Sequence, residues 1–153
     1  MTEQQRKKKV SEVKTFPVPF PLEKIKENIT TTSNPPSKPS QEQILNQALI
    51  FHSEGNISEA IKSYQYLINQ GCTDHRVFSN YGSILTSLGR LQEAELSTRK
   101  AIELCPDFAE LHFNLGIILK DLSKLQEAEL STRKAIELCP DYAMAHFNLG
   151  SIL

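Results

Sequence analysis

Residues 91–107 read LQEAELSTRKAIELCPD, and the same seventeen residues stand again at 125–141, 34 positions further along the chain. A shorter segment, HFNLG, repeats at the same distance, from His112–Gly116 to His146–Gly150. An internal period of this length is typical of a repeat protein, in which one small structural unit recurs along the chain. We therefore expect the rest of the sequence to follow the same period as these two copies.

One period, residues 109–142, shows the pattern of two helices. Apolar residues recur at helical spacing in two runs, Phe113, Leu115, Leu119 and Leu122, then Leu125, Ala128, Ala135 and Leu138. Ser123 and Lys124 separate the runs, and Pro140 follows the second, where a helix cannot simply continue. Small residues stand where we expect the helices to approach closely, namely Gly116, Ala128 and Ala135. Such a hairpin buries its apolar face by stacking on the next one.

In this register the chain resembles the tetratricopeptide repeat family. The family's pattern positions are occupied by His112, Leu115, Gly116, Leu119, Ala128, Thr132, Ala135 and Pro140. The chain departs from the pattern at Thr132, where the family has an aromatic residue, and at His112, where it has tryptophan. The resemblance implies an all-α, right-handed superhelical solenoid with repeats at 41–74, 75–108 and 109–142 and a partial repeat at 143–153. The first repeat lacks the closing proline, and we expect Gly71 to cap its second helix instead.

Composition divides the chain at about residue 40. Residues 1–40 carry eight Lys/Arg, four Asp/Glu and six of the eight prolines, whereas residues 41–153 carry nine Lys/Arg and fourteen Asp/Glu. We interpret residues 1–40 as a basic, Pro/Ser/Thr-rich leader or linker that is disordered or forms a short helix from Leu22. The net charge of −1 favours neither nucleic acid nor membrane as a partner, and no apolar run is long enough to span a bilayer. Three widely spaced cysteines and the lack of a signal peptide indicate a cytoplasmic protein.

The sequence contains no recognisable catalytic grouping or phosphate-binding loop, so we predict neither enzymatic activity nor a cofactor or metal. His112 and His146, like Cys105 and Cys139, are copies of one repeat position, and we interpret both pairs as structural. The charged residues of the second helices support those helices through pairs three and four apart, and we expect them to form a solvated face: Glu93, Glu95, Arg99, Lys100 and their copies.

One polar position recurs in all four first helices, at Asn46, Asn80, Asn114 and Asn148. In the tetratricopeptide family the first helices line a concave groove, and this row resembles the asparagine ladder of the O-linked N-acetylglucosamine transferases. An amide side chain has one acceptor and two donors and can bond the backbone of an extended peptide. The resemblance places further residues in the groove: Ser79, Ser83, Phe113, Ile117, Lys120, Phe147 and Ser151. The alternative is that these asparagines bond within or between helices.

Family members that bind chaperone C-termini use a clamp of Lys, Arg and Asn. Here the corresponding positions are Leu45, Leu49, Glu110 and Asn114, so we expect acidic C-terminal peptides not to be ligands.

Three functions remain open. The leading prediction is a module that binds an extended peptide or protein partner in the concave groove. The second is a substrate-recruiting portion of a glycosyltransferase or sulfotransferase whose catalytic domain lies elsewhere, which agrees with a repeat that stops after Leu153. The third is self-association through the open last helix, whose apolar residues would meet the third repeat on one side while its other side faces water: Phe147, Leu149, Ile152 and Leu153.

Overall fold

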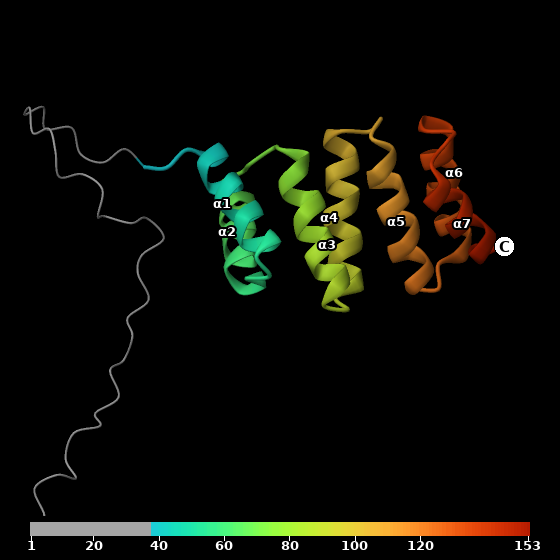
Figure 1. The fold of residues 1–153 in the computed structure, drawn as a ribbon, viewed down its shortest axis with the longest axis horizontal. Helices are drawn as coiled ribbons and strands as arrows, with labels where there is room; N and C mark the ends of the chain where they lie inside the picture. Colours follow the sequence, from blue (N-terminus) through green and yellow to red (C-terminus); the bar gives the residue numbers. More distant parts are fainter. Residues whose placement is uncertain (1–37) are drawn as a thin grey trace, which may run out of the picture. The chain divides into compact units, whose positions relative to one another are not determined.

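The computed structural model describes residues 38–153, and the predictions made for the leader lie outside this part, apart from its last three residues. The described part is all-α and contains seven helices (Figure 1). They are α1 (Gln41–Ser53), α2 (Ile57–Asn69), α3 (His75–Ser87), α4 (Leu91–Leu104), α5 (Ala109–Asp121), α6 (Leu125–Leu138) and α7 (Ala143–Ile152). None of these seven helices is long and apolar enough to cross a bilayer.

The first helix of each pair begins at the residue where the period of 34 places it, at Gln41, His75, Ala109 and Ala143. Polar caps fix two of these starts, with Ser40 before α1 and Asp74, which accepts from the Arg76 N–H, before α3. The Ser40 hydroxyl accepts from the Gln43 backbone N–H at 3.2 Å, while the Gln43 side chain accepts from the Ser40 N–H at 2.8 Å. This reciprocal arrangement satisfies donors that a helix start leaves unpaired.

The turn inside each hairpin requires a left-handed backbone at one position. Gly55 and Gly89 have φ of 75° and 72°, and their copy in the third hairpin is Ser123, at φ 60°. Gly71 has φ 72° just after α2, and the following N–H, of Cys72, bonds to the Leu67 carbonyl. The prediction that Gly71 ends the second helix is therefore confirmed.

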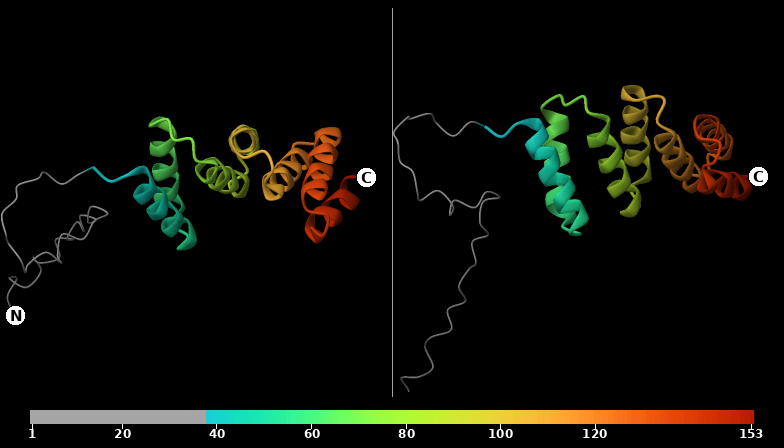
Figure 2. Two further views of the ribbon diagram at one scale, coloured as in Figure 1. Left: turned by 90° about the horizontal axis from the view of Figure 1, so that it is seen from above. Right: turned by 45° about the horizontal axis from the view of Figure 1, so that its top comes forward.

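The helices pack in chain order as antiparallel pairs (Figures 1 and 2). Across the pairs, α3 also packs against α5, and α5 against α7, whereas α4 and α6 are not packed together in this way. The first helices α3, α5 and α7 therefore follow one another along one side of the stack. We call the surface formed by α1, α3, α5 and α7 the inner face.

Within a pair, small residues allow close contact, as predicted. A Cβ placed on Gly116 would lie 2.4 Å from Thr132 Oγ1, and one on Gly82 would lie 2.7 Å from Thr98 Oγ1. Thr132 is fully buried and donates to the Ala128 carbonyl at 2.8 Å. Threonine thus fills the family's aromatic position without leaving an unpaired hydroxyl.

The prediction of a solvated face on the second helices is wrong for Glu95. This residue is only 8% exposed and accepts from Arg99 of its own helix and from Lys124 Nζ, at 2.8 Å, ahead of α6. Arg99 also bonds to Glu127 of α6 at 2.6 Å. Glu95 and Arg99 therefore connect two successive hairpins. The physical reason is that Lys124, which lies just ahead of α6, meets this carboxylate, so that Glu95 contacts the next hairpin instead of facing water.

The repeated histidines also hold successive hairpins together. His112 Nε2 lies 2.7 Å from the Pro106 carbonyl oxygen, and His146 Nε2 lies at the same distance from that of Pro140. Each ring donates to a carbonyl just after the preceding second helix, when its proton is on Nε2. This structural role agrees with the prediction from the sequence.

Candidate functional site

Two hollows lie next to each other along the inner face. The first is a space of about 260 Å³ between α3 and α5. Its walls are mostly hydroxyl and amide side chains and carry no charge: Ser79, Ser83, Thr86, Ser87, Thr98, Asn114, Ile117 and Ile118. This hollow offers hydrogen-bond donors and acceptors to a ligand.

The second hollow, of about 410 Å³, lies between α5 and α7. Its walls are mostly apolar: Phe113, Ile117, Lys120, Ala143, Met144, Phe147 and Asn148. Phe113 forms the floor because it is 6% exposed and packs against Tyr142 with ring centroids 4.9 Å apart. Phe147 and Met144 are open to solvent, at 81% and 62% exposed. Lys120 is the one charged residue of this hollow.

The hollows are built from equivalent repeat positions. Ser79, Ser83 and Thr86 of the first stand 34 residues before three residues of the second, Phe113, Ile117 and Lys120. Ile117 lines both hollows, so they are neighbours on the two sides of one α5 residue. The fold thus presents two chemically different versions of one site side by side.

The four asparagines of the predicted row have different surroundings. Asn46 is exposed and Asn114 is partly exposed, and neither side chain has a hydrogen bond to another residue of the described range 38–153. Asn80 Nδ2 donates to the carbonyl of Arg76 in its own helix at 2.8 Å. Asn148 is 5% exposed and donates to Thr132 Oγ1 at 3.2 Å. Asn114 lines the first hollow and Asn148 the second.

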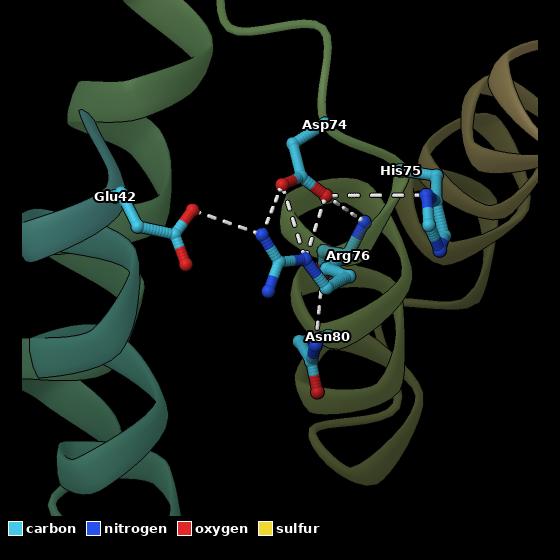
Figure 3. A network of polar contacts seen from close by, with 5 residues as sticks. All are labelled: Glu42, Asp74, His75, Arg76 and Asn80. Atoms are coloured by element: carbon cyan, nitrogen blue, oxygen red, sulfur yellow. Dashed lines mark hydrogen bonds and ion pairs between the residues drawn. The ribbon is translucent and has the colours of Figure 1, made fainter.

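The end of the inner face nearest α1 is occupied by an ion-pair network (Figure 3). Arg76 donates to Asp74 at 2.6 Å and to Glu42 of α1 at 3.0 Å. The hydrogen bond from the Arg76 side chain, more than any other influence, lowers the pKa of Asp74. The same bond, with that to Glu42, raises the pKa of Arg76. The one arginine on the inner face is therefore already paired with two carboxylates.

Six of the residues that line the two hollows were not predicted from the sequence to lie there: Thr86, Ser87, Thr98, Ile118, Ala143 and Met144. Met144 stands at the repeat position of Glu42, Arg76 and Glu110, so the side chain at this position differs from each copy to the next. A position that varies while the surrounding helix repeats is the signal that would have identified it.

Comparison with known families agrees with this architecture. A model described as TPR repeat matches residues 82–123, and one described as tetratricopeptide repeat matches residues 109–142. Residues 82–142 are tetratricopeptide repeats. No curated protein sequence matches it.

Solved structures that contain tetratricopeptide repeats share the fold of the helical domain. The first TPR domain of Spaghetti (RPAP3), bound to the HSP90 peptide SRMEEVD, is 21% identical, with a TM-score of 0.69 over 73% of this chain and 89% of that chain. The second TPR domain of human RPAP3, in complex with an HSP70 peptide, is 23% identical, with a TM-score of 0.67 over 71% and 91%. The O-GlcNAc transferase of Thermobaculum terrenum is 24% identical, with a TM-score of 0.67 over 74% of this chain and 22% of that one.

Proposed function

We propose that the inner face of residues 41–153 binds an extended peptide segment of a protein partner. The observation that carries the proposal is the pair of neighbouring hollows that share Ile117 as a lining residue. Both are open to solvent and are lined by successive first helices. An extended peptide advances about 3.3 Å per residue, so a short segment can cross from one hollow to the next.

In this proposal, Asn114 bonds to the backbone of the bound peptide and so does not depend on the peptide's sequence. Its amide is partly exposed, lines the first hollow and has no hydrogen bond to another described residue. Asn80 keeps its second amide N–H and its oxygen available, because only one bond to Arg76 is made. Amides at this position can pair with the N–H and C=O groups of a bound backbone, whatever its side chains.

Acidic chaperone tails fit this groove poorly, although the RPAP3 domains are solved with HSP90 and HSP70 peptides. The positions that would clamp such a tail are Leu45, Leu49, Glu110 and Asn114. Arg76 does not substitute for them because Asp74 and Glu42 already neutralise it. A peptide of high negative charge would have to displace these carboxylates.

The test removes the side-chain amides of Asn80 and Asn114 and keeps the helices folded. The double variant Asn80→Ala/Asn114→Ala should lose the partners that the unaltered protein captures from cell lysate, with unchanged helicity by circular dichroism. The control is Leu96→Ala/Leu130→Ala, which alters two side chains of the second helices that are 70% and 69% exposed. Equal capture by the asparagine variant and the unaltered protein would refute the proposal.

Recruitment of substrates to a transferase is the second candidate. It is supported by the asparagine row and by the fold shared with the Thermobaculum terrenum enzyme, of which this chain spans 22%. Reading the coding sequence beyond Leu153 tests it directly. A catalytic domain after further repeats supports it, and an immediate stop codon contradicts it.

Self-association through α7 is a separate proposal that rests on the exposure of Phe147, at 81%, and Leu153, at 80%. Light scattering after size-exclusion chromatography should then show a dimer at micromolar concentration. A monomer throughout that range would rule it out.

A further inference from the structure

All but one of the lysine and arginine residues in the helical domain lie close to a carboxylate. Residues 41–153 contain nine Lys and Arg residues, and eight of them lie within 4.0 Å of a carboxylate of the described residues: Lys62, Arg76, Arg90, Arg99, Lys100, Lys124, Arg133 and Lys134. The ninth is Lys120, which has no such partner within the part of the chain that the structure describes. Lys120 is therefore the cation of this domain that is free to meet an anionic ligand.

Lys120 has only one polar contact among these residues. Its Nζ donates to Ser151 Oγ at 3.1 Å, and that hydroxyl in turn donates to the Asn148 carbonyl at 2.7 Å. An ammonium group has three N–H donors, so two remain for a ligand. The contact across to Ser151 of α7 also holds the side chain over the second hollow rather than leaving it to extend freely into water.

The rest of the second hollow is suited to a large apolar side chain. Phe113 and Ile117 form its floor and side on α5, and Met144 and Phe147 extend from α7. The latter two are among the most exposed large apolar residues of the domain. Covering them with an apolar group removes unfavourable surface from water, at about 25 cal/mol per Å².

We infer that the second hollow is a specificity subsite for a large apolar side chain flanked by a carboxylate, on the peptide bound along the inner face. The apolar group would enter between Phe113 and Phe147, and the carboxylate would bond to Lys120 Nζ. This inference rests on the proposed function, since it assigns the ligand's chemistry at one end of the same groove. Lys120 occupies none of the chaperone-clamp positions, which are Leu45, Leu49, Glu110 and Asn114.

The first hollow has different residues at the same repeat positions, so the subsite is confined to the second hollow. At the positions of Phe113, Ile117 and Lys120, that hollow has two serines and a threonine. It can hydrogen-bond to a peptide, but it has neither the apolar walls nor the cation. A partner is therefore expected to carry its apolar and acidic residues at one end of the bound segment and small or polar residues at the other.

The experiment selects peptides from a displayed library of random heptapeptides on four forms of the full chain. These are the unaltered protein, Lys120→Thr, Lys120→Glu and the control Lys134→Thr, which changes a paired lysine on α6. Circular dichroism checks that each variant keeps its helicity. The unaltered protein and the control should enrich peptides with Asp or Glu within two positions of Phe, Leu, Ile or Met. Lys120→Thr should retain the apolar preference and lose the acidic one, and Lys120→Glu should select Lys or Arg instead.

Affinity for one enriched peptide gives the quantitative test by fluorescence anisotropy. Lys120→Thr should weaken binding about tenfold at low salt, and added salt should reduce the difference. Acid-flanked peptides that bind Lys120→Thr unchanged would overturn the inference. If Asn80→Ala/Asn114→Ala abolishes that binding while Lys120→Thr does not, the groove proposal stands and only the subsite fails. If the unaltered protein enriches no peptide, both fail.

Discussion

Helices α4 and α6 have the same fourteen-residue sequence, and this makes Glu95 and Glu129 a matched pair. The side chain of Glu95 is 11% exposed and is bonded by Arg99 and Lys124, whereas that of Glu129 is 34% exposed and pairs with Arg133 alone. Changing each glutamate to alanine removes the same atoms from the same local sequence. Any difference between the two variants in the free energy of unfolding therefore measures the contact with the next hairpin.

The expected loss of folding stability in each variant follows from the residues that bond to the glutamate it removes. A hydrogen bond to a charged group contributes about 1.5–3 kcal/mol when it is well shielded. Arg99 and Lys124 are both 43% exposed and regain water when the carboxylate is removed, so we expect Glu95→Ala to cost about 1–2 kcal/mol. Glu129→Ala removes one exposed pair four residues apart, worth about 0.3–0.5 kcal/mol. Because the change in helix propensity is the same in both variants, the difference should be about 1 kcal/mol.

The difference should also depend on pH. Burial raises the pKa of Glu95, but the hydrogen bonds from Lys124 and Arg99 outweigh it and leave the pKa below its ordinary value of 4.5. A carboxylate with a lowered pKa in the folded state stabilises the fold above its unfolded pKa. This contribution is lost as the pH falls through the folded pKa. The extra cost of Glu95→Ala should therefore be full at pH 7 and shrink in acid below about pH 4.5.

Urea unfolding followed by circular dichroism measures both free energies at pH 7 and again at pH 3. Glu95→Gln, which keeps the shape and removes the charge, separates packing from electrostatics. Equal losses for Glu95→Ala and Glu129→Ala at pH 7 would refute the claim that Glu95 joins two hairpins. A difference that persists undiminished at pH 3 would refute its electrostatic origin.

Two further predictions also use repeat copies as controls. Gly116→Ala should destabilise the fold by about 2 kcal/mol, because its Cβ would lie 2.4 Å from Thr132 Oγ1, while Gly150→Ala has nothing within 4 Å and should cost nothing in thermal unfolding. An equal loss in both would contradict the packing shown here. Ser123→Gly should stabilise the fold by about 0.5–1 kcal/mol in urea unfolding, since its φ of 60° disfavours a side chain. Gly89→Ser, the reverse change at the matching position, should destabilise the fold by a similar amount. A loss of stability in Ser123→Gly or a gain in Gly89→Ser would contradict the reasoning.

Much of the fold follows from one regularity in the sequence. Helices begin at Gln41, His75, Ala109 and Ala143, at the same spacing of 34 residues that separates the two identical segments. The small residues at close helix contacts were predictable for the same reason: periodic spacing determines which positions face each other. Gly71 was predictable because a left-handed residue must end the helix where proline is missing.

The burial of Glu95 could not be predicted in this way. Its local sequence is identical to that of Glu129, so no property of the surrounding residues distinguishes the two. What differs is the contact with the following hairpin, where Lys124 and Glu127 meet α4. Long-range contacts of this kind depend on the packed structure rather than on periodicity.

In the groove, too, the repeat predicts which residues are present but not the hydrogen bonds that they form. The repeat register predicted a row of asparagines on the first helices, and it predicted Phe113, Ile117 and Lys120 beside them. It did not predict that Asn80 would bond to its own helix or that Asn148 would be buried against Thr132. Side-chain rotamers and neighbouring hydroxyl groups decide these bonds, and both vary between copies.

The most direct test of peptide binding on the inner face is an NMR titration of the ¹⁵N-labelled protein with a peptide enriched on it. We predict shifts of the side-chain amide of Asn114 and of the backbone amides around Ile117 and Lys120, with continuous changes along α3, α5 and α7. Shifts confined to α2, α4 and α6 would place the ligand on the opposite side and contradict the account.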